Sequence, residues 1–177
     1  MIALAAVGSV EPDAIARLAP LLRETFRAEA VVARPLPLPD RGWNARHTQH
    51  LSTSILDELA RARRPEWERL LGICDVDLYV SGLNFVFGEA DAACRVAVFS
   101  LWRLHPSGTG KEAQELFQRR AATEAIHELG HTYGLAHCME RRCVMWFSNT
   151  LAESDAKGTA FCPTHAAALS RFRGKRE

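Results

Sequence analysis

The sequence predicts one domain of the α/β (α+β) class, in which helices pack on a mixed, twisted sheet. Apolar residues in the first two thirds of the chain alternate between a period of two and a period of about 3.6, the periods of strands and helices. Of the 177 residues, 47% are hydrophobic and 24% are charged, a balance that suits one globular core. Residues 1–177 contain no repeat, linker or low-complexity tract, so we expect a single domain.

The N-terminal elements are expected in the order strand, helix, strand, helix. Residues 2–8 form an apolar run typical of a buried strand, and residues 13–27 carry apolar side chains at helical spacing. Pro20 is expected to kink or split that helix, because proline cannot donate the backbone hydrogen bond of a helix interior. Residues 30–39 read as a strand that its prolines end, and residues 48–62 as a second amphipathic helix.

The later elements are expected to complete the sheet and to supply the longest helix. Residues 73–80 and 95–101 are rich in apolar and β-branched types, so both are expected to be strands. The stretch 83–91 between them is apolar but irregular, with a glycine available for a bulge or turn. Residues 111–133 carry one helical apolar stripe, and a short helix is expected to begin at Pro163.

Net charge and hydropathy exclude two classes of partner. Twenty-two basic and 21 acidic residues leave a formal net charge of +1, which does not suit binding to a nucleic-acid backbone. No apolar run approaches the roughly 18 residues of a membrane helix. The apolar start also lacks the basic leading region of a signal peptide, so we expect a soluble, cytoplasmic monomer.

The run HELGHTYGLAH contains a pair of histidines suited to binding one metal ion. His127 and His131 are four residues apart, so on a helix they lie one turn apart on the same face. Glu128 points about 100° away from His127, close enough to reach a metal-bound water without ligating the metal. A lone histidine on a helix is more often a surface or core residue. Chance would produce the full run in only on the order of one in 10⁵ chains of this length.

The third histidine of the run can join the pair only if the helix ends. His137 is six residues beyond His131, about 600° around a continued helix, and would point away from the pair. Gly134 tolerates the left-handed conformation that ends a helix, so we expect the chain to reverse there and bring His137 back. Three histidine nitrogens with one open position form a catalytic rather than a structural zinc site.

A second group of candidate metal ligands follows directly. The five cysteines are odd in number, which argues against a disulfide framework and favours metal ligation or burial. Cys138, Cys143, Cys162 and His165 have the spacing of a zinc site with three thiolates and one imidazole. The alternatives are that the cysteines are reduced, buried thiols, or that the site omits His165. A zinc ion here would stabilise the turn that follows the third histidine.

These motifs resemble those of a known protease family. HExxHxxGxxH followed by a nearby methionine is similar to the metzincin metalloproteases, with Met145 in the place of their Met-turn residue. HELGHTYGLAHC, CVM at 143–145 and CPTH at 162–165 resemble, more narrowly, the archaemetzincins, whose members bind a second zinc ion through four cysteines. The family pattern also includes a segment like NFVFG, here residues 84–88, before an edge strand.

The resemblance implies a fold and a role for each residue. It implies a metzincin-like domain with an active-site helix over about 111–133 and a zinc-bound C-terminal part over 134–177. It assigns catalytic zinc to His127, His131 and His137, the general base to Glu128, and structural zinc to Cys138, Cys143, Cys162 and His165. Two departures are the C-x-x-H ending, where the family has C-x-x-C, and the lack of a tyrosine after Met145. Oxyanion stabilisation would then come mainly from the metal.

We therefore expect a zinc metalloprotease that acts on a peptide or protein substrate and holds two zinc ions. An extended substrate could pair with residues 95–101 if that strand lies at the sheet edge, although simple core packing is an equal alternative for it. Two rival hypotheses keep the zinc without the activity: a catalytically silent binding or regulatory module, and a zinc-stapled structural domain. The intact Glu128 argues against the first, and the open metal position against the second.

Overall fold

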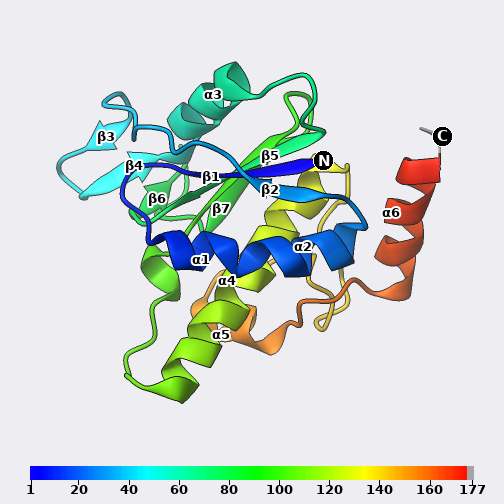
Figure 1. Cartoon of the computed structure of the whole chain (residues 1–177). Coiled ribbons are helices and arrows are strands. Elements are labelled where there is room, and N and C mark those ends of the chain that lie inside the picture. The colour runs from blue at the N-terminus through cyan, green and yellow to red at the C-terminus, as the bar shows by residue number, and fades with distance from the viewer. Residues whose placement is uncertain (175–177) are drawn as a thin grey trace.

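A five-stranded sheet runs through the molecule, with helices on both of its faces (Figure 1). The structure is a computed structural model that describes residues 1–174, so residues 175–177 of the predicted domain lie outside the described residues. In spatial order the strands are β2 (Ala30–Val32), β1 (Ile2–Ala6), β5 (Arg69–Cys74), β8 (Val96–Ser100) and β7 (Gly88–Asp91). The first four are parallel to one another, and β7 runs antiparallel to β8, so the sheet is mixed as predicted.

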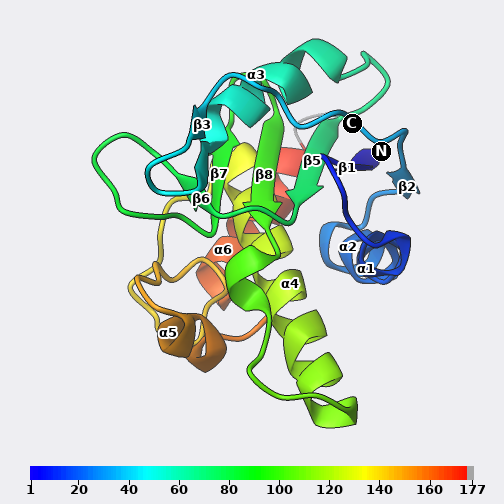
Figure 2. The ribbon, with the colours of Figure 1, turned by 90° about the vertical axis from the view of Figure 1, so that its left-hand side faces the viewer.

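The central strands are apolar on both sides because both faces of the sheet are covered. Every residue of β5 and β8 is buried. On one face the sheet packs against α3 (Ser52–Ala62), whose Ile55 and Leu59 are fully buried. The helices of the opposite face are α1 (Pro12–Ala16), α2 (Leu18–Phe26) and α4 (Lys111–Thr132) (Figures 1 and 2). Near-continuous apolar strands are typical of such a two-sided arrangement.

Smaller elements complete the described chain. A second sheet joins β3 (Trp43–Asn44), β4 (Gln49–Leu51) and β6 (Leu78–Tyr79). A single 3₁₀ turn, η1 (Trp102–Leu104), follows β8, and α5 (Leu151–Ala156) and α6 (Pro163–Gly174) lie in the C-terminal part. None of the helices in residues 1–174 is long and apolar enough to cross a membrane.

The longest helix is close to its predicted extent. α4 spans Lys111–Thr132, one residue shorter than expected at its C-terminal end. Of its predicted apolar stripe, Ala121, Ala125 and Leu129 are buried, as is Tyr133 just beyond the helix. The helix predicted to begin at Pro163 is confirmed as α6. Regular spacing of apolar side chains identified both helices because it reports directly which face is covered.

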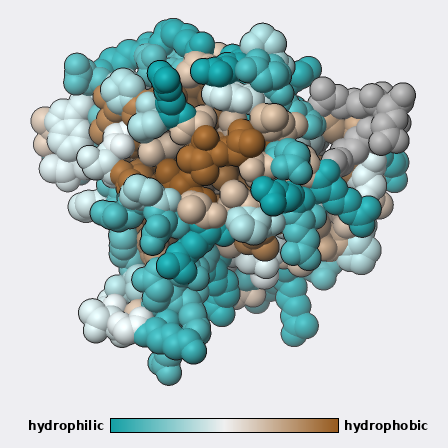
Figure 3. Space-filling view, viewed as in Figure 1, coloured by the Kyte–Doolittle hydropathy of each residue, from teal (hydrophilic) through white to brown (hydrophobic). Residues whose placement is uncertain are grey.

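Of the two alternatives for residues 95–101, core packing is confirmed and the sheet edge is wrong. β8 lies inside the sheet, paired with β5 on one side and β7 on the other. The edge strand is instead β7, which lies in the segment that the sequence predicts to be irregular. Its four residues are all half-buried, so they show none of the alternation that marks a strand. The opposite edge is β2, where Val32 is 58% exposed, and apolar side chains gather over β1 and β2 on this face (Figure 3).

The prediction of one strand over 73–80 is also wrong. The central strand β5 ends at Cys74, and only the two residues of β6 pair further along, in the small sheet. Between them, Asp75 and Asp77 bind side chains of the segment after β8, so these two acidic residues at alternate positions serve polar contacts rather than one face of a strand. A short apolar run such as that of β5 cannot be assigned by periodicity alone.

The boundaries of four N-terminal elements differ from those predicted, and the first of them, the strand expected over 2–8, ends at Ala6. The helix expected over 13–27 splits at Arg17 rather than at Pro20, which lies in the first turn of α2, where no donor is required. The strand expected over 30–39 pairs only over 30–32. The helix expected over 48–62 begins at Ser52, because the three residues before it form β4.

Candidate metal centres and substrate cleft

The C-terminal half of α4 places the first three candidate residues beneath the sheet. His127 and Glu128 are 6% and 5% exposed, and His131 is half-buried. The helix packs on β7 and β8 on one side and on the chain after it on the other, so its polar side chains lie in a largely dry environment. Groups held there are desolvated and fixed in position.

The helix ends at the predicted glycine. Gly134 has φ +79°, and its N–H donates to the His131 carbonyl at 2.9 Å. The Leu135 N–H donates to the Gly130 carbonyl at 3.2 Å. These two bonds form a Schellman motif with a left-handed residue just beyond the helix. The backbone conformation, rather than lack of space, requires glycine here, since no atom lies within 4 Å of a Cβ built at Gly134.

The reversal at this glycine brings the three histidines together. One ring nitrogen from each of His127, His131 and His137 lies within 4.8 Å of the others. The Nε2 atoms of His127 and His131 are 3.1 Å apart. The ring centroid of His137 lies 5.4 Å from that of His127 and 4.8 Å from that of His131. The predicted convergence of these residues is therefore present in the structure.

The hydrogen bonds of two of these rings suit metal ligation. His127 Nδ1–H donates to the Val144 carbonyl, and His131 Nδ1–H donates to the Leu135 carbonyl, both at 2.8 Å. Because a carbonyl oxygen only accepts, these contacts place the proton on Nδ1 and leave the lone pair of Nε2 facing the other ring. Backbone acceptors of this kind commonly orient metal-binding histidines. The residues present therefore fit a zinc ion bound through nitrogen.

Desolvation lowers the pKa of all three imidazoles. Desolvation lowers the pKa of His127 well below its ordinary value, and the nearby charge of Lys157 lowers it further. Burial also lowers the pKa of His131 and of His137. A lowered histidine pKa favours the unprotonated form at neutral pH, which is the form that binds a metal.

Glu128 lies beside the histidines but is held differently. Burial raises the pKa of its carboxyl group well above the ordinary range, and the neighbouring Glu124 raises it further. Lys157 acts in the opposite direction. A carboxylate with a raised pKa is a stronger base than a solvated one, so this position suits proton transfer.

The second group of candidate ligands also comes together. Single ligand atoms of Cys138, Cys143, Cys162 and His165 all lie within 4.8 Å of one another. Cys138 Sγ is 3.8 Å from Cys162 Sγ, and Cys143 Sγ is 3.8 Å from His165 Nδ1. Thiolates on one tetrahedral zinc ion are separated by about 3.8 Å. His165 Nε2–H donates to the Ala136 carbonyl at 3.1 Å, which leaves Nδ1 free to ligate.

The two groups are joined by a short, buried turn. The Cys138 N–H donates to the Met145 carbonyl at 2.9 Å, and Cys138 directly follows His137. Met145 is fully buried beneath α4, and the next residue back, Val144, accepts the hydrogen bond of His127. The residue predicted to occupy the Met-turn position therefore lies in the turn whose backbone contacts both groups.

A cleft of about 610 Å³ opens onto the histidine group. It is lined by the segment from Leu83 to Ala90, which includes three residues of β7, and by Phe147, Ser148 and Asn149. Glu124, Glu128 and Lys157 line the floor together with the three histidines. Such a groove beside a reactive centre suits binding of an extended chain.

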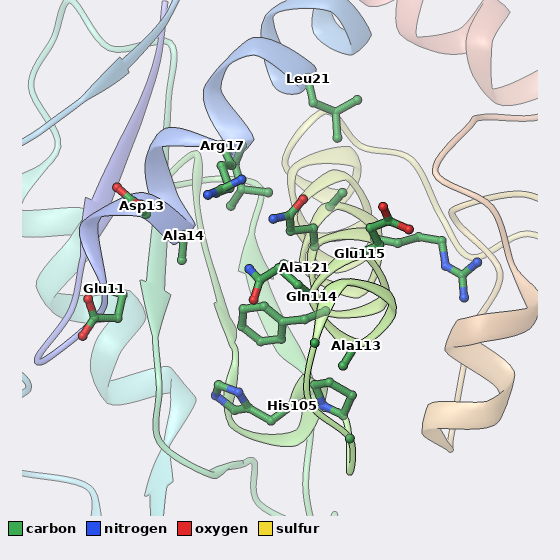
Figure 4. A pocket seen from close by; sticks show the side chains of 18 of the residues that line it. Glu11, Asp13, Ala14, Arg17, Leu21, His105, Ala113, Gln114, Glu115 and Ala121 are labelled. Carbon is green, nitrogen blue, oxygen red and sulfur yellow. The ribbon is translucent and has the colours of Figure 1, made fainter.

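A larger cavity, of about 960 Å³, lies away from this chemistry. It is bounded by α1, α2 and the N-terminal half of α4, and Glu11, Asp13, His105 and Gln114 surround it (Figure 4). None of the candidate metal ligands lines it, so the smaller cleft is the candidate substrate site.

Sequence reasoning missed a buried ion pair at the cleft. Lys157 Nζ lies 3.4 Å from Glu124 Oε1, and these side chains are only 1% and 2% exposed. Lys157 Nζ also lies 3.5 Å from His127 Nδ1. Glu124 could have been found, because three residues before His127 is the same helix face. Lys157 is the C-terminal capping residue of α5. The capping box at Thr150 signals where that helix begins, but it does not indicate what Lys157 contacts.

The comparisons with known proteins agree with this arrangement. The pattern of peptidase family M54 matches residues 44–171. The archaemetzincin of Methanopyrus kandleri is 44% identical over 125 residues, 71% of this chain and 68% of the relative. That of Pyrococcus furiosus is 34% identical over 170 residues, 92% of this chain and 88% of the relative.

The fold agrees as well. The crystal structure of the Methanopyrus kandleri archaemetzincin matches with a TM-score of 0.86 and 36% identity, over 98% of this chain and 94% of that chain. A match over nearly the whole length of both chains covers the sheet, α4 and both ligand groups. The chain therefore belongs to peptidase family M54, the archaemetzincins, and is a zinc metallopeptidase.

Proposed function

We propose that this chain hydrolyses peptide bonds at the three-histidine site with Glu128 as the general base, and that the Cys/His group holds a second, structural zinc ion. The observation that carries the proposal is the convergence of His127, His131 and His137 beside a buried glutamate in a cleft. We also propose that residues 1–177 act as one domain, since the ligands come from both sides of Gly134.

His127, His131 and His137 would hold the catalytic zinc ion through one ring nitrogen each, which is Nε2 in His127 and His131. When bound, zinc supplies a Lewis acid that lowers the pKa of a bound water toward about 7 and polarises a substrate carbonyl. The chain's own contribution is to fix the ligands. The carbonyls of Val144 and Leu135 hold two of the rings in the ligating orientation.

Glu128 would move the proton. Its carboxylate accepts a proton from the attacking water and returns it to the leaving amine, which needs a base whose pKa lies nearer neutrality than that of a solvated glutamate. Burial and the charge of Glu124 supply that shift. Glu128 adjoins His127 in sequence but is absent from the ligand group, so it is free for this role.

The substrate would bind as an extended strand along β7. This strand pairs with β8 on one side only, and three of its residues, Gly88, Glu89 and Ala90, line the cleft. An unpaired edge offers backbone donors and acceptors to a peptide. β7 thus replaces residues 95–101 as the proposed partner of the substrate.

Replacement of Glu128 tests the catalytic part of the proposal. Glu128→Ala should abolish cleavage of a peptide library while leaving the zinc content at the wild-type value, because the glutamate is not a ligand. Wild-type activity in the zinc-loaded variant would contradict the proposal. Absence of cleavage by the wild-type protein would instead favour the silent binding module.

Replacement of Cys143 tests the second zinc site. Because one turn joins both groups, Cys143→Ser should lower the zinc content of both, measured by elemental analysis of the purified protein. The free thiol of Cys94, exposed in the turn between β7 and β8, provides a matched control in Cys94→Ser. A fully occupied, active histidine site in Cys143→Ser would show that the two sites are independent.

A further inference from the structure

We propose that Arg103 is a positioning residue that fixes the aromatic wall of the cleft and so sets its preference for a large apolar substrate side chain. The inference rests on the proposed function, because it concerns the substrate bound at that site. Arg103 lies in η1 and does not line the cleft. It would act through the ring of Phe85, which does line the cleft.

The wall is an apolar segment without regular structure. Residues 83–87 lie between β6 and β7 and all line the cleft. Phe85 and Phe87 pack edge to face, with ring centroids 5.3 Å apart. Leu83 is 54% exposed, and Phe147, from a second segment that lines the cleft, is 46% exposed. Apolar surface from two segments of the lining suits a large apolar side chain.

Arg103 holds the Phe85 ring from behind. Its Cζ lies 4.0 Å from the ring centroid, within the range of a cation–π contact. Its Nε and Nη2 both donate to Asp77, at 2.5 and 2.7 Å. Because the two bonds form a planar fork, they fix the plane of the guanidinium group and therefore the surface on which Phe85 rests.

A second contact ties the backbone of the same segment to the same carboxylate. Gln49 Nε2 donates to Asp77 Oδ2 at 3.0 Å and to the Asn84 carbonyl at 2.8 Å. Gln49 is 7% exposed, and the side chain of Asp77 is 12% exposed. The ring of Phe85 and the carbonyl next to it are thus held from one buried point.

This network is separate from the metal site. The described contacts of Arg103 and Gln49 involve Asp77, Phe85 and Asn84, and none of them involves a histidine of the ligand group. Loss of the network should therefore change how the cleft receives a side chain without changing how the metal is bound. That difference separates a positioning role from a general loss of structure.

The binding of two hydroxamates measures the preference of the cleft for a large apolar side chain without requiring any peptide cleavage. Acetohydroxamic acid binds a protein-held zinc ion and carries no side chain, whereas a peptidyl hydroxamate with a phenylalanyl side chain also occupies the cleft. Isothermal titration calorimetry on the zinc-loaded full chain gives the ratio of their dissociation constants. The wild-type protein should favour the phenylalanyl compound, and Arg103→Ala should reduce that preference by about tenfold.

The variants are chosen to show the route of the effect. Phe85→Leu should give a similar loss, and Arg103→Ala with Phe85→Leu should lose no more than either alone, because both act through one contact. Arg103→Lys keeps the charge but not the fork, so its loss should be intermediate, and it replaces the alanine variant if that fails to fold. Arg41→Ala, which removes an exposed ion pair with Asp57, should change nothing.

Several outcomes would overturn the inference. One is an unchanged ratio in Arg103→Ala or Arg103→Lys, and another is an equal loss of affinity for both hydroxamates, which would indicate damage to the metal site. A wild-type protein without preference for the phenylalanyl compound would also overturn it. If the wild-type protein shows the preference but cleaves no peptide, the proposed function fails and the role of Arg103 stands.

Discussion

Glu128 packs directly on the backbone of Gly88. A Cβ built at position 88 would lie 2.6 Å from Glu128 Cγ, 2.7 Å from Glu128 Cδ and 2.6 Å from the Val98 carbonyl oxygen. Carbon atoms in favourable contact are about 3.5–4.0 Å apart, so no side chain fits there. β7 and α4 can approach this closely only because position 88 is a glycine, and the approach fixes the position of the glutamate.

Gly88→Ala should displace Glu128 and lower the turnover number for peptide hydrolysis. A shift of about 1 Å at a reacting group costs on the order of 100-fold in rate. Zinc content should stay at the wild-type value, since none of the ligands moves. Gly108→Ala is the matched control, because the nearest atom to its added Cβ, that of Ala113, is 3.9 Å away. Wild-type turnover in Gly88→Ala would exclude this positioning role.

Gly130→Ala should destabilise the protein although it lies inside a helix. Alanine is favoured over glycine in a helix interior by about 1 kcal/mol. Here the added Cβ would lie 2.5 Å from Met145 Sδ, so the methionine beneath the histidines must move. Overpacking of a core costs about 1–3 kcal/mol. Urea unfolding of the zinc-loaded protein measures the change, and a raised midpoint would show that Met145 adjusts freely.

The buried pair of Lys157 and Glu124 should be strongly coupled. Lys157→Met leaves the buried charge of Glu124 without a partner and should lower the free energy of unfolding by about 3 kcal/mol. Ser154 alone, which donates to Glu124 at 2.6 Å, cannot replace a cation. The double variant Lys157→Met with Glu124→Gln should be less destabilised than the sum of its parts. Additive losses in urea unfolding would mean that the two groups do not interact.

The five thiols should react in a fixed order. In the zinc-loaded protein at pH 8, iodoacetamide should label only Cys94, which is exposed. A chelator should release Cys138, Cys143 and Cys162. Cys74 should react only after unfolding, because burial raises the pKa of its thiol to about 12. Mass spectrometry of the labelled protein gives the order, and early labelling of Cys143 would argue against the second zinc ion.

The raised pKa of the Cys74 thiol predicts that the folded protein loses stability at alkaline pH. The pKa of Cys74 is raised from an ordinary value of 9.0, so the folded state holds the proton more tightly than the unfolded state. Its contribution to stability is therefore complete below pH 9 and is lost as the pH rises from 9 toward 12. Cys74→Ala should reduce the steepness of this alkaline loss in urea titrations, and an unchanged slope would exclude Cys74 as its cause.

The sequence by itself determined the α/β class, the extent of α4 and the residues of both candidate ligand groups. These features depend on local spacing, since residues four apart share a helix face and a glycine in the left-handed conformation ends a helix. For that reason, a short stretch of sequence was enough to predict that His127 and His131 share a helix face and that the chain reverses at Gly134.

Only the tertiary structure decided which strand forms the edge, that Lys157 lies beside His127, and that Arg103 rests under Phe85. Each of these contacts joins segments far apart in the chain, and periodicity reports that a side chain is covered without reporting what covers it. β7 shows no alternation because it is half-buried throughout, and the apolar run of β5 is interrupted by Gly72 and begins with an arginine, so it did not stand out from its surroundings. The local spacing of residues in the sequence thus determined which side chains form the candidate site. Packing between segments that are distant in the chain determined which residues line the cleft.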